Sequence, residues 1–307
     1  MPHAVAITPD GEFAAGDVTP DSLFWLASMT KPVTTLGALR LDLDLDAPVT
    51  DYVPDFARLG VLEGGTLRPP KTQATIRHLL THTSGLGYYF WRPELLQWRR
   101  EHGVDRHKIY AEPLVADPGT RFEYGISTDW LGRVIEAVSG QPLDAYLRDE
   151  IFTPLGMADT TFHPQRERVV GVHVRKDGAW QARGPASDDD PEWHAGGHGL
   201  FSTPRDYARF AQALLDEPDL FEPQVDFPPA LTSAHPRVAA DLTLGPGYSW
   251  STAMLVRENQ GGWMGLCNTY FWVDRTAGTT AALFTQTQPF ADPAILDLAR
   301  RVGAFYA

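Results

Sequence analysis

The chain has little that would let it bind nucleic acid, cross a membrane or depend on disulfide bonds. Its 26 Lys and Arg residues stand against 39 Asp and Glu residues, which gives a formal net charge of −13. A nucleic-acid partner is not expected, because phosphate backbones are bound by concentrated positive charge. The one cysteine, Cys267, excludes an intrachain disulfide. No stretch approaches the roughly 18 apolar residues of a membrane helix.

The first residues also lack the features of a secretory signal. The stretch MPHAVAITPDGEF has neither a basic segment nor an apolar core, and signal peptides need both. The sequence therefore predicts a cytoplasmic protein. Hydrophobic residues make up 43% and charged residues 21% of the 307 positions, which is typical of a soluble globular protein with a sizeable core.

The N-terminal region predicts a hairpin followed by a helix. Residues 3–8 and 12–15 are β-prone and flank Asp10-Gly11, a strong tight-turn signal. Pro32 is tolerated in the first turn of a helix but not deeper inside one. The helix therefore begins close to Ser28, and Ser28 and Lys31 share its first turn as surface neighbours three residues apart.

The middle of the chain favours helices and the end favours strands. Helical spacing covers residues 74–81, 128–139, 142–152 and 204–215, with Thr203 as the N-cap of the last of these. The β-rich runs are 248–256, 269–274 and 279–286, with a turn predicted at 259–262, and residues 294–305 close as a helix. We expect residues 216–246 to form a loop with short turns.

These patterns predict an α+β fold with an antiparallel sheet flanked by helices. The connections between the late strands are too short for parallel crossovers, which need a dozen or more residues. The sheet should combine both chain ends and enclose a mainly helical inserted domain. We expect residues 1–40 and 200–307 to form the sheet domain and residues 41–199 the helical domain, with the active site between them.

The stretch FWLASMTKPV, residues 24–33, contains the most reactive pattern in the chain. A serine hydroxyl is a poor nucleophile until a base takes its proton. Lys31 can be that base for Ser28 only if burial or nearby charge lowers its pKa. By itself the spacing fits a solvated lysine beside a capping serine better than it fits a nucleophile beside its base.

Further motifs follow SMTK in a fixed order. They are HLLTHTSGL at 78–86, PGTRFEYGIS at 118–127, LGRVIEAVSG at 131–140, PLGM at 154–157 and GGHGLFST at 196–203. Together they resemble the serine β-lactamase-like superfamily over residues 22–290. The resemblance is closest to the class C-related esterases called family VIII carboxylesterases and to related acyltransferases. It implies a β-lactamase-like fold and an acyl-enzyme reaction.

The resemblance also implies the catalytic residues. Ser28 would form the acyl-enzyme, while Lys31 and Tyr124 would manage the proton. The backbone N–H groups of Ser28 and Leu266 would form the oxyanion hole that stabilises the tetrahedral intermediate. We expect no metal and no cofactor to take part.

The segment GWMG at 262–265 stands where β-lactamases have Lys-Thr-Gly, and it resembles the Trp-Gly-Gly segment of family VIII esterases with Met264 in the middle. The missing lysine removes the cation that would hold a β-lactam carboxylate, which favours neutral esters. Aromatic residues gather where the family has its acyl pocket, and an apolar cleft suits a hydrophobic ester. The predicted substrate-binding residues are Trp263, Gly265, Tyr88, Tyr89 and Trp193, and Phe90 and Trp91 lie in the same aromatic run.

Two departures from the family pattern stand out. Tyr124 is followed by Gly125 and Ile126, so the polar third residue of the β-lactamase motif is missing. The helix that begins near Ser28 passes directly into residues 41–48, LDLDLDAP, where relatives usually have a longer helix. A shortened helix would loosen the Ser28 site.

Other chemistries find less support. His78 and His82 have the spacing of a helical zinc motif, but position 79 is Leu where a zinc protease has Glu. No G-x-S-x-G motif is present, which disfavours an α/β-hydrolase.

The sequence therefore predicts a serine hydrolase that cleaves short- to medium-chain carboxylic esters through acyl-Ser28, with acyl transfer as a further outcome. The alternatives are a β-lactamase or D-Ala-D-Ala-type peptidase, and a non-catalytic binding protein of the same fold. The expected partner is a small-molecule ester, and the oligomeric state stays open.

Overall fold

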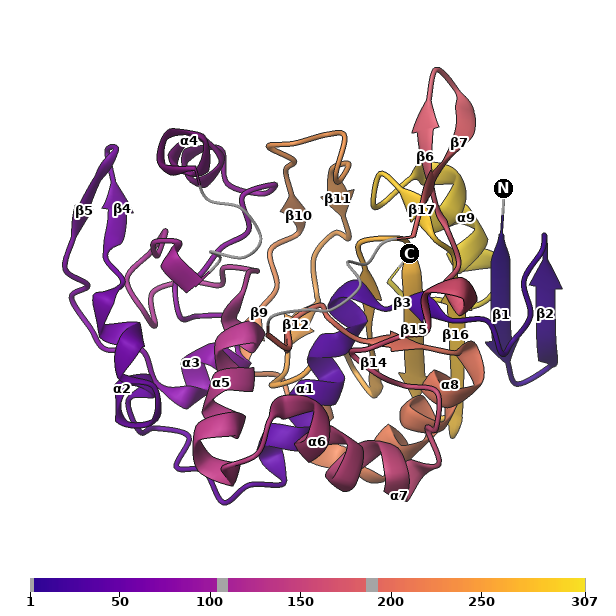
Figure 1. The fold of residues 1–307 in the computed structure, drawn as a ribbon, viewed down its shortest axis with the longest axis horizontal. Coiled ribbons are helices and arrows are strands. Elements are labelled where there is room, and N and C mark those ends of the chain that lie inside the picture. Colours follow the sequence, from indigo (N-terminus) through magenta and orange to yellow (C-terminus); the bar gives the residue numbers. More distant parts are fainter. Residues whose placement is uncertain (1–2, 104–109, 186–192, 307) are drawn as a thin grey trace.

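A twisted sheet of eight strands dominates one side of the protein in the computed structural model, which describes residues 3–103, 110–185 and 193–306 (Figure 1). In spatial order its strands are β2 (Gly11–Ala15), β1 (Ala4–Thr8), β16 (Thr279–Phe284), β15 (Thr269–Asp274), β14 (Gln260–Gly265), β13 (Leu255–Arg257), β12 (Ser249–Trp250) and β9 (Val225–Asp226). Every neighbouring pair is antiparallel. Strands from both chain ends therefore meet in one antiparallel sheet, as predicted.

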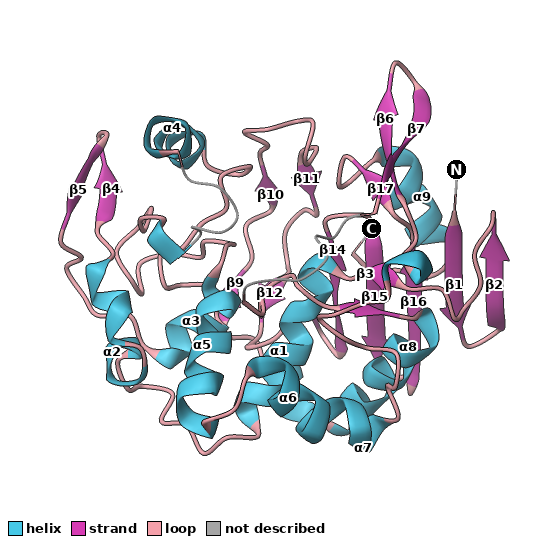
Figure 2. Cartoon of the chain, viewed as in Figure 1, coloured by secondary structure: helices cyan, strands magenta, loops and turns pink. Residues whose placement is uncertain are grey.

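Most helices lie on the other side of the molecule, as Figure 2 shows. The helices are α1 (Thr30–Leu39), α2 (Val49–Tyr52), α3 (Ile76–Leu80), α4 (Pro93–His102), α5 (Ser127–Ser139), α6 (Leu143–Leu147), α7 (Thr153–Leu155), α8 (Pro204–Ala213) and α9 (Pro293–Arg301). Helix α8 packs on the sheet against β1, β15 and β16, and α1 packs against α5 and α6. Within the described ranges, no helix is both long and apolar enough to span a bilayer.

Four smaller β elements lie outside the large sheet. They are β3 (Phe24–Trp25) with β8 (Phe201–Ser202), β4 (Val61–Glu63) with β5 (Thr66–Arg68), β10 (Ala230–Leu231) with β11 (Leu242–Thr243), and β6 (Val172–Lys176) between β7 (Ala179–Gly184) and β17 (Thr287–Gln288). The pair β3–β8 matters most for function, because it fixes the chain immediately before Ser28.

Helix α1 is short, but its neighbours enclose it. All residues from Thr30 to Ala38 are buried. Pro32 lies in the first turn, as predicted, where its missing N–H leaves no intrahelical partner unsatisfied. The Tyr146 hydroxyl donates to the Gly37 carbonyl at 3.0 Å and ties α6 to α1. The shortened helix is therefore held by packing on every side.

Two predicted boundaries were wrong, and close packing explains both. Residues 248–256 do not form one strand, because Ser251 Oγ accepts from the N–H groups of Ala253 and Met254, at 3.1 and 3.2 Å, and turns the chain between β12 and β13. The turn predicted at 259–262 is already strand β14 from Gln260 onward. A Cβ at Gly261 would lie 2.7 Å from the Met254 methyl carbon, so this glycine permits close packing and does not form a turn.

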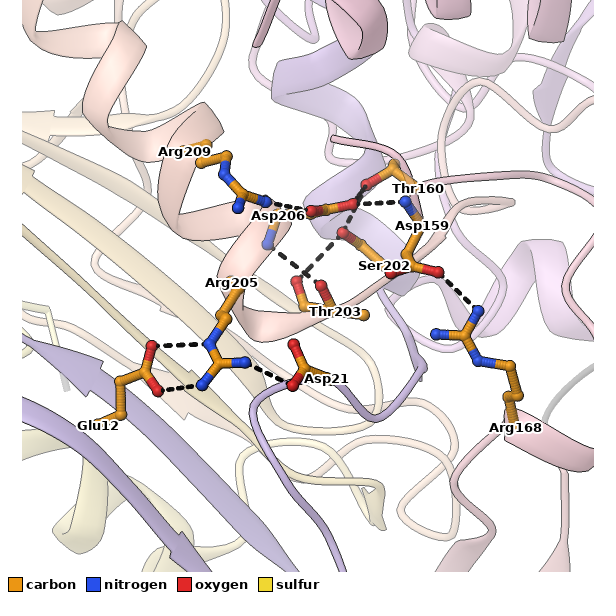
Figure 3. Close-up of polar contacts among 10 residues, drawn as sticks. All are labelled: Glu12, Asp21, Asp159, Thr160, Arg168, Ser202, Thr203, Arg205, Asp206 and Arg209. Carbon is orange, nitrogen blue, oxygen red and sulfur yellow. Dashed lines mark hydrogen bonds and ion pairs between the residues drawn. The ribbon is translucent and has the colours of Figure 1, made fainter. Parts of the chain in front are cut away.

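A polar network fastens the segment after the inserted helices to α8 (Figure 3). Asp206 is 3% exposed, and its carboxylate accepts from the Asp159 N–H at 2.8 Å and from the Thr160 hydroxyl at 3.2 Å. Thr203 caps α8 by accepting from the Asp206 N–H at 3.2 Å, which confirms the predicted N-cap. Arg205 bridges to Glu12 at 2.7 Å and thereby joins α8 to the first hairpin. The domain division at residues 40 and 200 stays a prediction.

Candidate active site

Ser28 lies in a strained turn directly before α1. The 3₁₀ turn Ala27–Met29 leads into the helix, and Ala27 has a φ of 47°, in the left-handed region. Such a conformation costs on the order of 1–3 kcal/mol and needs surrounding structure to hold it. Leu26 provides that support, because its N–H donates to the Leu200 carbonyl at 2.9 Å and its carbonyl accepts from the Thr269 hydroxyl at 3.2 Å.

Lys31 lies one turn further on and points at Ser28. Its Nζ is 3.2 Å from Ser28 Oγ, 2.9 Å from the Tyr88 hydroxyl and 2.8 Å from the Gly197 carbonyl oxygen. The side chain is 1% exposed. Burial lowers the pKa of Lys31 to about 7, against the opposing charge of Asp129. The structure therefore brings the predicted pair together, with the lysine partly uncharged at neutral pH.

Tyr124 lies beside the same pair. Its hydroxyl accepts from Trp263 Nε1 at 2.7 Å, and Lys31 Nζ lies 5.0 Å from the centre of its ring. Burial raises the pKa of Tyr124 above its ordinary value of 10.0, although hydrogen bonds with Ser28 and Trp263 oppose the rise. The phenol therefore keeps its proton at neutral pH.

Tyr88 occupies a position that the sequence did not reveal. The prediction placed it in the acyl pocket, whereas its hydroxyl contacts Lys31 Nζ directly. Burial raises the pKa of Tyr88 well above 10.0, so this phenol also stays protonated. Its place after the HTSGL segment is the only sequence signal, and nothing there separates it from Tyr89.

Strand β14 brings the predicted substrate-binding segment against the Ser28 turn. A Cβ at Gly265 would clash with the Leu26 carbonyl oxygen and the Thr269 hydroxyl, so only glycine lets the strand end approach so closely. The Tyr306 hydroxyl donates to the Trp263 carbonyl at 2.8 Å and secures the strand from its other side. Leu266 follows immediately and lines the pocket with Ser28. The role of its N–H in an oxyanion hole stays a prediction.

An apolar pocket opens at Ser28. Its lining residues are Ser28, Phe90, Trp91, Tyr124, Leu231, Leu242, Trp263, Met264, Leu266 and Phe290. Neither Tyr89 nor Trp193 belongs to this lining. The ring of Tyr89 packs against the Arg99 guanidinium at 4.1 Å, and Trp193 packs against Tyr110 with ring centres 4.9 Å apart. The sequence missed Leu231, Leu242 and Phe290, which come from short loop strands and the C-terminal segment.

The glycine-rich segment 196–199 passes between α1 and α5. The Thr34 hydroxyl donates to the Gly196 carbonyl at 2.7 Å, and a Cβ at Gly196 would lie 2.7 Å from the Thr128 carbonyl oxygen. The Gly197 N–H donates to Asp129 Oδ1 at 2.9 Å, and the Gly197 carbonyl accepts from Lys31. The GGHGL motif thus supplies a backbone acceptor that faces the lysine.

One group of described residues has the composition of a metal site. Ligand atoms of Asp144, His163 and His194 lie within 4.8 Å of one another, and the two imidazole Nε2 atoms are 2.9 Å apart. His78 and His82 do not form the helical zinc pair, because His78 Nδ1 accepts from the Thr75 N–H at 3.2 Å and caps α3. Burial lowers the pKa of His82 well below 6.5, and the imidazole stays neutral beside Lys31.

Comparisons with known proteins agree with this geometry. The family model described as Beta-lactamase matches residues 3–304. The chain belongs to the beta-lactamase family. Acyltransferase calJ from Penicillium decumbens is 32% identical in an alignment that spans 92% of this chain and 80% of that protein. Lovastatin esterase from Penicillium rubens is 30% identical in an alignment that spans 80% of this chain and 72% of that protein.

A solved structure of the same fold extends the comparison. Simvastatin synthase (LovD) from Aspergillus terreus, in the LovD6 mutant form, superposes with a TM-score of 0.85 at 27% identity, and covers 100% of this chain and 90% of that one. These findings confirm the β-lactamase-like fold and the predicted resemblance to esterases and acyltransferases of the superfamily. The protein is accordingly an enzyme of the beta-lactamase family that acts on carboxylic esters.

Proposed function

We propose that the protein cleaves short- to medium-chain carboxylic esters through an acyl-Ser28 intermediate. The observation that carries the proposal is the buried Lys31 amine, with a pKa of about 7, placed 3.2 Å from Ser28 Oγ. A base is most effective when its pKa lies near the working pH. Lys31 meets that condition and has the nucleophile within reach.

The partners of Lys31 suit an uncharged amine. A neutral lysine has two N–H donors and one lone pair. The Tyr88 hydroxyl and the Gly197 carbonyl take the two donors, which leaves the lone pair for the Ser28 O–H. In the first step Lys31 accepts the Ser28 proton as Oγ attacks the ester carbonyl carbon. The N–H groups of Ser28 and Leu266 stabilise the resulting oxyanion.

The raised pKa values of Tyr88 and Tyr124 indicate which group is the base and which is a proton donor. Because Tyr124 stays protonated where Lys31 is already half neutral, Lys31 is the base and Tyr124 a proton donor. As the tetrahedral intermediate collapses, the ester C–O bond breaks and the alcohol leaves with a proton from the Lys31 ammonium, passed through the Tyr124 hydroxyl. Water or a second alcohol then attacks acyl-Ser28 by the reverse sequence, which frees the acid or a new ester.

The pocket favours a neutral, apolar acyl group. No Lys or Arg belongs to the described lining of the Ser28 pocket, so this lining offers no cation to bind a β-lactam carboxylate. Arg257, the arginine of strand β13, packs on the Tyr248 ring, with 4.6 Å between the guanidinium carbon and the ring centre. The names of the relatives include both an esterase and an acyltransferase. We therefore propose that hydrolysis and acyl transfer share the same acyl-enzyme.

The test compares wild type with Ser28→Ala on p-nitrophenyl acetate, butyrate and hexanoate and on a chromogenic cephalosporin. We expect ester turnover that Ser28→Ala abolishes, and little cephalosporin cleavage. Ser139→Ala is the matched control, since Ser139 Oγ donates to the Ile135 carbonyl at 2.7 Å and accepts from the Gln141 N–H at 3.2 Å, at the last residue of α5. Rapid cephalosporin turnover would favour the β-lactamase alternative. No turnover and no fluorophosphonate adduct on wild type would favour a binding protein.

A further inference from the structure

Asp129 is a buried carboxylate behind the active site for which the reaction described above has no role. It lies in the first turn of α5 and is 0% exposed. Oδ1 accepts from the Gly197 N–H at 2.9 Å and lies 3.3 Å from His198 Nδ1. Oδ2 has no hydrogen-bond partner among the described residues. Burying a carboxylate costs several kcal/mol unless nearby groups compensate.

Gly197 lies between the Asp129 carboxylate and Lys31, and it forms a hydrogen bond with each of them. Gly197 donates its N–H to Asp129 and accepts from Lys31 Nζ, at 2.8 Å, with its own carbonyl oxygen. A Cβ at position 197 would clash with the Asp129 carboxylate, so glycine is required for this approach. One residue thus links the negative carboxylate to the amine that faces Ser28.

The carboxylate also acts on Lys31 through its charge. Burial lowers the pKa of Lys31 and the charge of Asp129 raises it, so the value of about 7 is the balance of the two. We propose that Asp129 is a positioning residue, which holds the Gly197 carbonyl against Lys31 and places a buried carboxylate behind the amine. The inference rests on the proposed function, because it takes Lys31 to be the base.

Other titratable groups face this pair and bear on any pH profile. They are His82, Tyr88, Tyr110, Glu112, Tyr124 and His198. His82 stays neutral and the three phenols stay protonated near neutral pH, because burial moves their pKa values away from it. Burial raises the pKa of Glu112 to about 7, although its carboxylate pairs with Arg99 at 2.8 Å. Glu112 and His198 therefore need variants of their own.

The experiment is the pH dependence of kcat/KM for p-nitrophenyl butyrate in Asp129→Asn. The amide oxygen can still accept from the Gly197 N–H, but the charge is gone. The acid limb is the part of the profile where kcat/KM falls as Lys31 becomes protonated. We expect it to move to lower pH by about one unit, because the Asp129 charge that raises the pKa of Lys31 is lost. Asp129→Ala also removes the acceptor, and we expect kcat to fall about tenfold further.

Three variants separate this effect from general destabilisation. Asp206→Asn is the matched control, because Asp206 is also a buried carboxylate that accepts from a backbone N–H, at 2.8 Å, but belongs to the α8 network of Figure 3. We expect Asp206→Asn to lower the melting temperature and leave the acid limb in place. His198→Gln and Glu112→Gln should also keep the limb, which would then belong to Lys31.

The possible outcomes distinguish this inference from the proposed function. An acid limb that stays fixed in folded, active Asp129→Asn overturns the role of Asp129 and leaves the esterase intact. A limb that moves equally in Asp206→Asn overturns it as well. If wild type turns over no ester, the pH dependence of Ser28 labelling by a fluorophosphonate replaces the kinetic readout. Absence of that labelling would overturn both the proposed function and the inference.

Discussion

Replacing Lys31 with methionine should change how the stability of the protein depends on pH. Methionine fills similar space but does not titrate. Burial lowers the pKa of Lys31 from 10.5 to about 7 in the folded protein. Between these two pH values the unfolded chain keeps the lysine proton while the folded chain has released it. The folded state then binds fewer protons, so wild type gains stability as pH rises through this window.

The size of the gain follows from the two pKa values. A tenfold change in a protonation equilibrium corresponds to about 1.4 kcal/mol. From pH 6 to pH 9 the free energy of unfolding of wild type should rise by about 3 kcal/mol relative to Lys31→Met. The full effect, reached above pH 10.5, is about 5 kcal/mol. Below pH 7 the lysine is charged in both states, and the whole cost of burying that charge remains.

Urea denaturation followed by tryptophan fluorescence at pH 6, 7.5 and 9 measures this difference. Lys71→Met is the control, because the Lys71 side chain is 76% exposed, and we expect it to follow wild type at each pH. A difference between wild type and Lys31→Met that is the same at pH 6 and pH 9 would refute the reasoning. It would mean that Lys31 keeps an ordinary pKa, and Lys31 would then be too strongly protonated to act as the base.

Three further predictions concern the tyrosine, the strand and the cysteine. Tyr124→Phe should lower kcat by about a hundredfold or more, as loss of a proton donor does. Trp263→Phe removes the 2.7 Å hydrogen bond to that phenol together with part of a ring that lines the pocket, and it should lower kcat about tenfold. Equal effects on kcat in steady-state kinetics would contradict this division. Gly265→Ala should cost at least about tenfold in kcat/KM and lower the melting temperature, because its Cβ has no room. Gly171→Ala should do neither, because a Cβ there would lie 3.9 Å from the nearest backbone atoms of Gly184, which is an ordinary contact. Cys267 is buried, with its pKa raised to about 12 by burial, so iodoacetamide should label it only in denaturant; labelling of the native protein, seen by mass spectrometry, would show that the strand end opens.

Predictions from local pattern succeeded where the decisive interactions are local. The hairpin of β1 and β2 follows from Asp10-Gly11, and the Thr203 cap of α8 follows from one side chain and the N–H three residues later. The predicted turn at residues 259–262 is wrong, because strand β14 begins at Gln260. Gly261 makes room for the Met254 side chain, and Gly262 makes room for the Phe271 carbonyl on the neighbouring strand. Neither contact can be inferred from the residues next to the glycines in the sequence.

Within the active site, too, the contacts between distant parts of the chain could not be predicted from local sequence. Trp263 was predicted to meet substrate, and it also donates to the Tyr124 hydroxyl across 139 residues of chain. Tyr88 and Tyr89 are adjacent and chemically identical, yet only Tyr88 reaches Lys31. In this loop the two neighbouring side chains point in different directions, and the packing of the whole domain decides which of them faces the active site.

The sequence by itself determined that a serine and a lysine share one helical turn, because a spacing of three residues is a local property of helices. It also determined an antiparallel sheet, because short connections admit no other pairing. Only the tertiary structure decided that this lysine is buried, since the groups that enclose it, Tyr88 and Gly197, lie 57 and 166 residues away along the chain. Burial is what lowers the lysine pKa, so the chemistry of the pair depends on contacts that no local sequence pattern contains.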